Sequence, residues 1–164
     1  MMRITLDTNA VDKSDLIQKA THIGLDLVVV TVTEMELQNS SIVIDGSIGR
    51  TPEIFVLDQS RLDVGALASD EDCERFEDIL RVISNNSFPP VGKRENLSRG
   101  QQRQLRDAMA FTSHVRDRRD IFVTDDAKGF INEGRRSYLE QKYHTKIMKA
   151  YEFLDYLFEY DRKK

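Results

Sequence analysis

The chain of 164 residues is 40% hydrophobic and 32% charged, with a formal net charge of −4. This composition is typical of one globular domain, here residues 1–164, and excludes a disordered or fibrous chain. The apolar runs are too short to cross a bilayer, and the single cysteine, Cys73, cannot form an internal disulfide. We therefore expect a cytoplasmic protein without a membrane partner, in which Cys73 is a small buried side chain.

Charge is unevenly distributed along the chain. Residues 1–80 contain 16 Asp and Glu against 6 Lys and Arg, whereas residues 81–164 contain 12 against 18. The acidic half argues against a protein that coats nucleic acid without specificity, while the basic half can still contact a phosphate backbone. The three histidines lack the spacing of zinc ligands, so a His/Cys zinc site is not expected.

Hydrophobic periodicity and helix-capping residues predict alternating strands and helices. In chain order we expect a strand at 3–6, a helix from Ser14 to Gly24, a buried strand at 27–32, a short helix at 34–38, helices at 69–83 and 98–116, a strand at 121–124, a helix at 134–143, a strand at 146–148 and a helix at 150–160. Residues 39–98 form a variable, insertion-like region, with a possible extra strand at 53–57. Helical crossovers between strands predict a three-layer α/β/α fold with a mostly parallel central sheet.

Acidic residues stand where the predicted strands end. Asp7 follows the first strand, Glu34 begins the helix after the second, and Asp125 and Asp126 follow the strand at 121–124. Ligands of parallel sheets bind beyond the carboxyl ends of the strands, so these acids are expected at one edge. Asp107 lies in the helix before the last of these strands, on the border of its buried face.

A group of carboxylates in one place repels itself unless a cation neutralises it. Mg²⁺ or Mn²⁺ prefers such oxygen ligands, and one or two ions could polarise a phosphoryl oxygen and activate water for phosphodiester hydrolysis. A single Asp at a strand end is more often a turn or capping residue. The prediction therefore depends on the joint pattern of three strand-end acids and one helix acid.

At these residues the sequence resembles the PIN-domain family of nucleases. The similar segments are residues 4–9 (ITLDTN), 31–37 (TVTEMEL), 105–110 (LRDAMA) and 122–130 (FVTDDAKGF), followed by a last strand and an amphipathic helix. The resemblance implies metal-dependent cleavage of RNA by an endoribonuclease, and a PIN-like fold. It also implies a partner, because many small bacterial members are toxins paired with an antitoxin; a homodimer is a further possibility.

Carried onto this chain residue by residue, the resemblance implies a set of site residues. The catalytic acids would be Asp7, Glu34, Asp107 and Asp126, which with Asp125 would also bind the metal, and Asn9 and Thr124 would support them. Glu36 stays open as an alternative to Glu34, although helical spacing turns it about 200° away.

Three arginines on the Asp107 helix, Arg99, Arg103 and Arg106, recur at helical spacing and form one basic stripe. Beside the acids such a stripe could hold RNA phosphates, and it could be extended by Lys93, Arg94, Arg135 and Arg136. For any one of these arginines alone, a solvated helix face is the slightly better explanation.

Other enzyme classes fit the sequence less well. A haloacid-dehalogenase-type phosphatase needs a second Asp where Asn9 stands, and a dinucleotide-binding fold needs a glycine-rich turn after the first strand. The acids also come in the wrong order for a response-regulator receiver. The remaining alternative is a non-catalytic PIN-like module that binds RNA or protein, although keeping four unused carboxylates together would cost stability.

Overall fold

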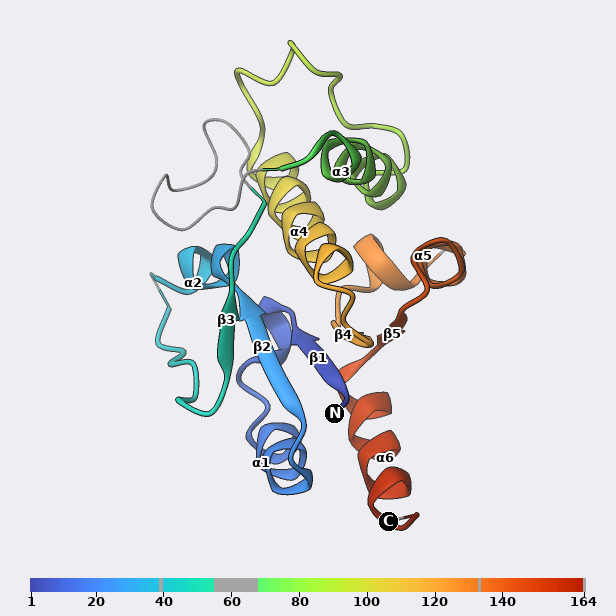
Figure 1. Ribbon diagram of the computed structural model, residues 1–164. Coiled ribbons are helices and arrows are strands. Elements are labelled where there is room, and N and C mark those ends of the chain that lie inside the picture. The colour runs from blue at the N-terminus through green and yellow to red at the C-terminus, as the bar shows by residue number, and fades with distance from the viewer. Residues whose placement is uncertain (39, 55–67, 133, 164) are drawn as a thin grey trace.

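A five-stranded parallel sheet forms the centre of the protein, in a computed structural model that describes residues 1–38, 40–54, 68–132 and 134–163 (Figure 1). Its strands are β1 (Arg3–Leu6), β2 (Asp26–Val30), β3 (Gly49–Thr51), β4 (Ile121–Val123) and β5 (Lys146–Met148). They lie in the order β3-β2-β1-β4-β5, and each neighbouring pair is parallel. The predicted α/β class with a parallel sheet is confirmed.

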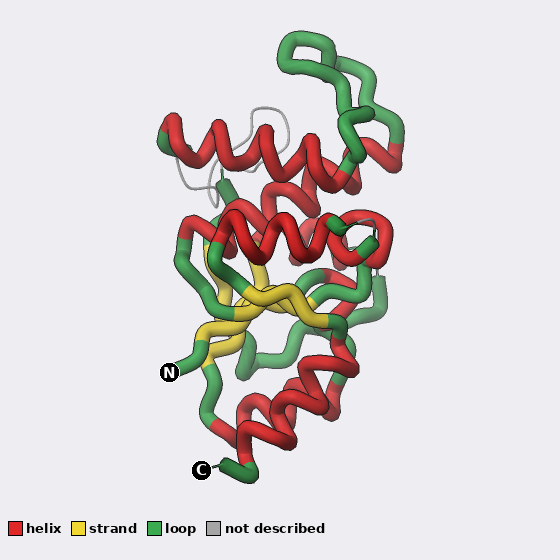
Figure 2. Tube along the Cα trace, turned by 90° about the vertical axis from the view of Figure 1, so that its right-hand side faces the viewer, coloured by secondary structure: helices red, strands yellow, loops and turns green. Residues whose placement is uncertain are grey.

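Helices cover both faces of the sheet, as Figure 2 shows. They are α1 (Ser14–Ile23), α2 (Thr31–Leu37), α3 (Asp70–Ile83), α4 (Arg99–Arg116), α5 (Arg135–Tyr143) and α6 (Ala150–Asp161), with a 3₁₀ turn η1 (Thr8–Ala10) and a π turn η2 (Ala127–Ile131). Side chains alternate along each strand, so Leu6 and Val29 pack with α1 and α6, whereas Val30 and Phe122 pack with α3, α4 and α5. Two cores separated by the sheet make the predicted three-layer arrangement.

Local sequence explains where several helices begin and end. Ser69 and Ser98 each accept a hydrogen bond from a backbone N–H at the start of α3 and α4, and the side chains of Asp72 and Gln101 accept one in return. Each pair forms a capping box that satisfies otherwise unpaired N–H groups. Gly24 ends α1 in the left-handed conformation, with φ of 79°, which costs glycine little.

The largest differences between the structure and the sequence prediction concern two strands. β2 ends at Val30 rather than Val32, because α2 already begins at Thr31. An extra strand, β3, is formed by Gly49–Thr51, and of the strand predicted at 53–57 residues 55–57 lie outside the described residues. Pairing with β2 determines this edge strand, since its sequence has little strand propensity of its own.

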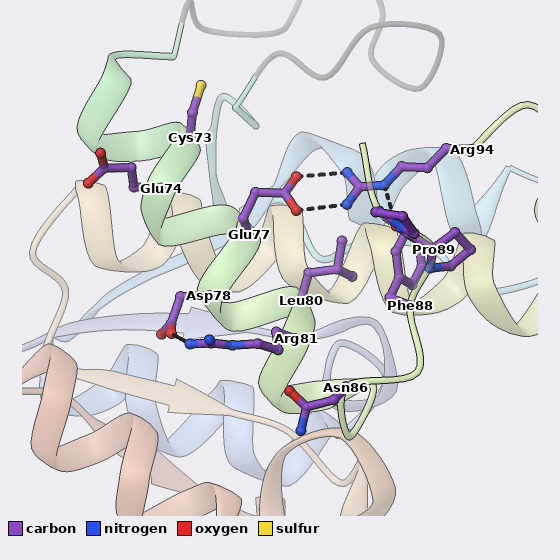
Figure 3. Close-up of a pocket in the computed structure, with 11 residues that line it drawn as sticks. Cys73, Glu74, Glu77, Asp78, Leu80, Arg81, Asn86, Phe88, Pro89 and Arg94 are labelled. Carbon is purple, nitrogen blue, oxygen red and sulfur yellow. Dashed lines mark hydrogen bonds and ion pairs between the residues drawn. The ribbon is translucent and has the colours of Figure 1, made fainter. Parts of the chain in front are cut away.

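The insertion-like region contains α3 and a loop that folds back beside it (Figure 3). Arg94 holds this loop through two 2.7 Å bonds to the Glu77 carboxylate and a 2.9 Å bond to the Pro89 carbonyl, and its guanidinium lies over the Phe88 ring. Loop and helix enclose a surface cavity of about 660 Å³, and exposed Cys73 lines it. The expectation that Cys73 is buried is therefore wrong, because it faces this hollow rather than the core.

Candidate active site

Four carboxylates from separate elements approach one another at the carboxyl ends of the strands. Asp7 directly follows β1, Asp126 lies three residues after β4, Glu36 is in α2 and Asp107 is in α4. The two central ones are buried, with 3% of Asp7 and 7% of Asp107 exposed. The parallel topology causes this convergence, because strands that run the same way end at the same edge.

Asp7 is held by three donors. Its carboxylate accepts hydrogen bonds from the Thr8 backbone N–H at 2.8 Å, the Thr124 hydroxyl at 2.6 Å and the Asn9 amide at 3.1 Å. The Asn9 side-chain carbonyl in turn accepts from the Asp125 backbone N–H at 2.8 Å. Thr124 and Asn9 thus join the ends of β1 and β4 and fix the Asp7 carboxylate. Both residues therefore lie where they could support the acids, as the sequence analysis expected.

Asp126 occupies the start of the π turn. One carboxylate oxygen accepts from the backbone N–H groups of Lys128 and Gly129, at 3.1 and 3.2 Å, and its own N–H donates to the Thr124 hydroxyl at 3.1 Å. A Cβ at Gly129 would lie 2.6 Å from the other oxygen, Oδ2. Gly129 is therefore a site residue that the sequence analysis missed, although a glycine three positions after a strand-end Asp was visible there.

Burial and mutual repulsion disfavour the charged forms of the two central acids. The pKa of Asp7 is raised from 3.8 to about 6, chiefly by burial and further by the charges of Glu36 and Asp126, against the hydrogen bonds from Thr124 and Thr8. The pKa of Asp107 is also raised, well above its ordinary value, first by burial and then by the charges of Asp7, Glu36 and Asp126. The charges of Glu36 and Asp126 thus act on both central acids, and that of Asp7 acts on Asp107, so the four carboxylates interact electrostatically.

The structure brings Glu36 rather than Glu34 into this group. Glu36 accepts a hydrogen bond from the Thr8 hydroxyl beside Asp7 and lies 3.6 Å from a guanidinium nitrogen of Arg106 on α4. Glu34 instead forms a 2.8 Å ion pair with Arg50 on β3, where both side chains are 40% exposed. The two glutamates point to different neighbours because two positions along a helix correspond to a rotation of about 200°.

Asp125 lies at the margin of the acidic group. Its carboxylate accepts the backbone N–H of Ala150 at 2.9 Å and so caps the first turn of α6. The side chain is exposed, and its charge is not among the causes given for the raised pKa of Asp7 or Asp107. Helix capping thus accounts for one carboxylate oxygen of Asp125, and its part in metal binding stays a prediction.

The predicted basic stripe divides into free and paired arginines. Arg99 and Arg103 are exposed and have no hydrogen bond or ion pair within the described residues, and the charge of Arg103 lowers the pKa of Asp107. Arg106 is half-buried against Glu36. Arg94 is bound to Glu77, and Arg136 bonds to Glu152 at 3.0 Å, so neither extends the stripe.

The donor set suits a hard cation. In the part of the chain that the structure describes, no three His, Cys, Asp or Glu side chains are grouped as a ready-made ion site. The acidic group nevertheless offers only oxygen ligands. Burial and mutual repulsion keep the pKa values of Asp7 and Asp107 raised, although the charge of Arg103 lowers that of Asp107 and Arg106 lies 3.6 Å from Glu36. Mg²⁺ and Mn²⁺ bind such oxygens, usually with water completing the coordination shell.

Comparison with known proteins adds no family. No family model matches the chain, and the search of curated proteins found no match either. Among the described residues, no helix is both long and apolar enough to cross a membrane.

Proposed function

We propose that this protein is a metal-dependent, PIN-like endoribonuclease whose acids are Asp7, Glu36, Asp107 and Asp126. The observation that supports the proposal best is the approach of four carboxylates beside the carboxyl ends of β1 and β4, where Asp7 and Asp107 are buried and have raised pKa values. Such a group is costly without a cation and common where a cation acts on phosphate. The sequence resemblance to PIN-domain nucleases supports the same function.

Each acid has a distinct part in this proposal. Asp7 is fixed by its three hydrogen bonds and would be the most rigid ligand. Asp107 accepts no hydrogen bond from the described residues, so both of its oxygens are available. A bound Mg²⁺ or Mn²⁺ would neutralise these carboxylates and polarise a phosphoryl oxygen of the substrate. Glu36 and Asp126 flank the pair and would orient the attacking water.

RNA phosphates have a plausible contact on the same helix as Asp107. Arg103 is close enough to lower the pKa of Asp107, and its exposed guanidinium is free to bind a phosphate. Arg99 lies one turn earlier on the same side of α4. These arginines would hold the RNA backbone without reading its sequence.

Cleavage of end-labelled single-stranded RNA in Mg²⁺, in Mn²⁺ and in EDTA tests the proposal. We expect metal-dependent cleavage that falls about 100-fold or more in Asp107→Asn and Glu36→Gln, because the first substitution removes an anionic metal ligand and the second removes a group that orients the attacking water. Glu34→Gln is the matched control, two residues away on the same helix, and should keep its activity. Equal losses in Glu34→Gln and Glu36→Gln would contradict the assignment of the second acid.

The non-catalytic alternative makes a different prediction in the same assay. A PIN-like binding module would retain RNA without cutting it, and Asp107→Asn would bind as well as the wild type. The partners implied by the resemblance, an antitoxin and a second copy of the chain, stay predictions. Co-purification of a small protein and the mass of the purified chain in solution test them.

A further inference from the structure

A second cavity adjoins the acidic group. It has a volume of about 440 Å³ and lies between the first turns of α1 and α6, which pack side by side on one face of the sheet (Figure 1). It is lined by Asp12, Lys13, Ser14, Asp15, Leu16, Asp125, Ala150, Tyr151 and Leu154. This volume is in the range of small-ligand sites. Asp125 is shared with the margin of the acidic group, since Asp126 follows it directly.

The lining combines an aromatic surface with one carboxylate, Asp15, that has no partner among the described residues. Tyr151 is 61% exposed, although it is a large ring, and Leu16 and Leu154 add apolar surface beside it. Asp125 caps α6 and Asp12 lies 3.6 Å from the Lys13 ammonium. Asp15 has no hydrogen bond or ion pair within the described residues, so its carboxylate is free to accept two hydrogen bonds.

We propose that this cavity is a guanine subsite for the nucleotide next to the cleaved phosphate, an inference that rests on the proposed nuclease function. The base would stack on Tyr151, because every nucleobase has a π face that packs on an aromatic ring. Guanine presents N1–H and N2–H side by side, which match the two oxygens of the Asp15 carboxylate. Adenine, cytosine and uracil lack this adjacent pair of donors. Lys13, on the same wall, would contact the phosphate of that nucleotide.

An arginine side chain of a protein partner has related chemistry, since a guanidinium also stacks on rings and pairs with carboxylates. The position of the cavity favours the base. The backbone N–H of Asp125 bonds to Asn9, whose amide also bonds to Asp7, so one hydrogen-bond chain connects the cavity to the acidic group. In the proposed complex the phosphate lies at Asp7 and the base lies in this cavity.

Binding measured without cleavage tests the subsite directly. In an Asp107→Asn background, NMR titration with guanosine, inosine, adenosine, cytidine and uridine should shift signals of the cavity residues most strongly with guanosine. Inosine lacks the N2 amino group and should bind about tenfold more weakly, because it loses one hydrogen bond to the charged Asp15 carboxylate. Asp15→Asn and Tyr151→Ala should each weaken guanosine binding about tenfold. The matched controls are Asp155→Asn and Phe158→Ala, which lie on α6 outside the cavity. Neither control substitution should weaken guanosine binding.

Cleavage-site mapping on a mixed-sequence RNA separates failure of the subsite from failure of the nuclease. With active enzyme we expect cuts next to guanine, and loss of that preference in Asp15→Asn with cleavage retained. Cleavage without base preference, unchanged by both substitutions, would overturn the subsite alone. Guanosine-selective binding without cleavage would overturn the nuclease and keep the subsite. Saturable binding of arginine amide with no nucleoside binding would identify a peptide site instead and overturn the proposal.

Discussion

Replacing Asp7 with Asn tests whether the acidic group costs the metal-free protein stability. Asp7 is 3% exposed and keeps its three hydrogen-bond donors, yet burial and neighbouring charges raise its pKa from 3.8 to about 6. Each unit corresponds to 1.36 kcal/mol, so keeping Asp7 ionised above pH 6 costs the folded state about 3 kcal/mol. Asn removes this charge with almost no change in shape.

The hydrogen bonds limit the gain. Asn keeps one carbonyl oxygen, and its amide nitrogen cannot accept from Thr124 or Asn9, which bond to the second oxygen of Asp7. Each lost bond costs about 1 kcal/mol. The net stabilisation expected in EDTA at pH 7.5 is therefore about 1 kcal/mol, or a rise in Tm of about 2–4 °C for a domain of this size.

The pH dependence of stability tests independently whether removal of the Asp7 charge stabilises the folded state. A carboxyl with a raised pKa in the folded state contributes its full stability below pH 3.8, and this is lost as pH rises through about 6, because the unfolded chain releases its proton first. The difference in free energy of unfolding between Asp7→Asn and the wild type should therefore be small at pH 4, increase up to about pH 6 and stay constant above it. Buried His114 has a pKa lowered to about 3, so its contribution to the stability of the folded state is lost as pH falls below 6.5. This loss is equal in the wild type and in Asp7→Asn, so it cancels in the difference between their stabilities.

Thermal unfolding of the wild type, Asp7→Asn and the exposed control Asp155→Asn, in EDTA from pH 4 to 8, measures this difference. Addition of Mg²⁺ should then raise the Tm of the wild type but not of Asp7→Asn, since an ion that binds only the folded state stabilises it. A wild type more stable than Asp7→Asn at pH 7.5 in EDTA, or a difference that is the same at every pH, would refute the electrostatic reasoning.

Three further outcomes follow from the same geometry. At sub-saturating Mg²⁺, the cleavage rate should fall about tenfold per pH unit below about 6, because Asp7 must be ionised to bind the ion, and a flat profile between pH 5 and 7 would contradict this. Gly129→Ala should lower activity about tenfold or more with little change in Tm, because the new Cβ would displace the Asp126 carboxylate 2.6 Å away; undiminished cleavage would show that this carboxylate is not needed. Arg103→Ala should reduce the magnitude of the slope of log RNA affinity against log salt concentration by about 0.7, because one phosphate contact to a single strand is lost. The matched change Lys146→Ala, at the amino end of β5, should leave that slope unaltered. Equal changes of slope in the two variants would mean that overall charge, rather than a contact at Arg103, determines the affinity.

Much of the site was determined by local sequence. Helix capping depends on residues a few positions apart, which is why Ser69 and Ser98 predicted the starts of α3 and α4 correctly. Strand ends follow from short buried runs, and parallel strands share an edge. The positions of Asp7 and Asp126 beside each other were therefore predictable before any contact was known.

Only the tertiary structure decided which glutamate joins them. Glu34 and Glu36 are equally acidic and occupy the same short helix, and the sequence places both near the end of β2. The choice depends on how α2 packs between η1 and α4, where Thr8 and Arg106 contact Glu36, while β3 supplies Arg50 to Glu34. These contacts join residues far apart in the chain, and β3 itself forms through pairing rather than propensity. Local patterns determine elements and their ends, whereas the rotation of a helix about its axis is set by the non-local surfaces it packs against.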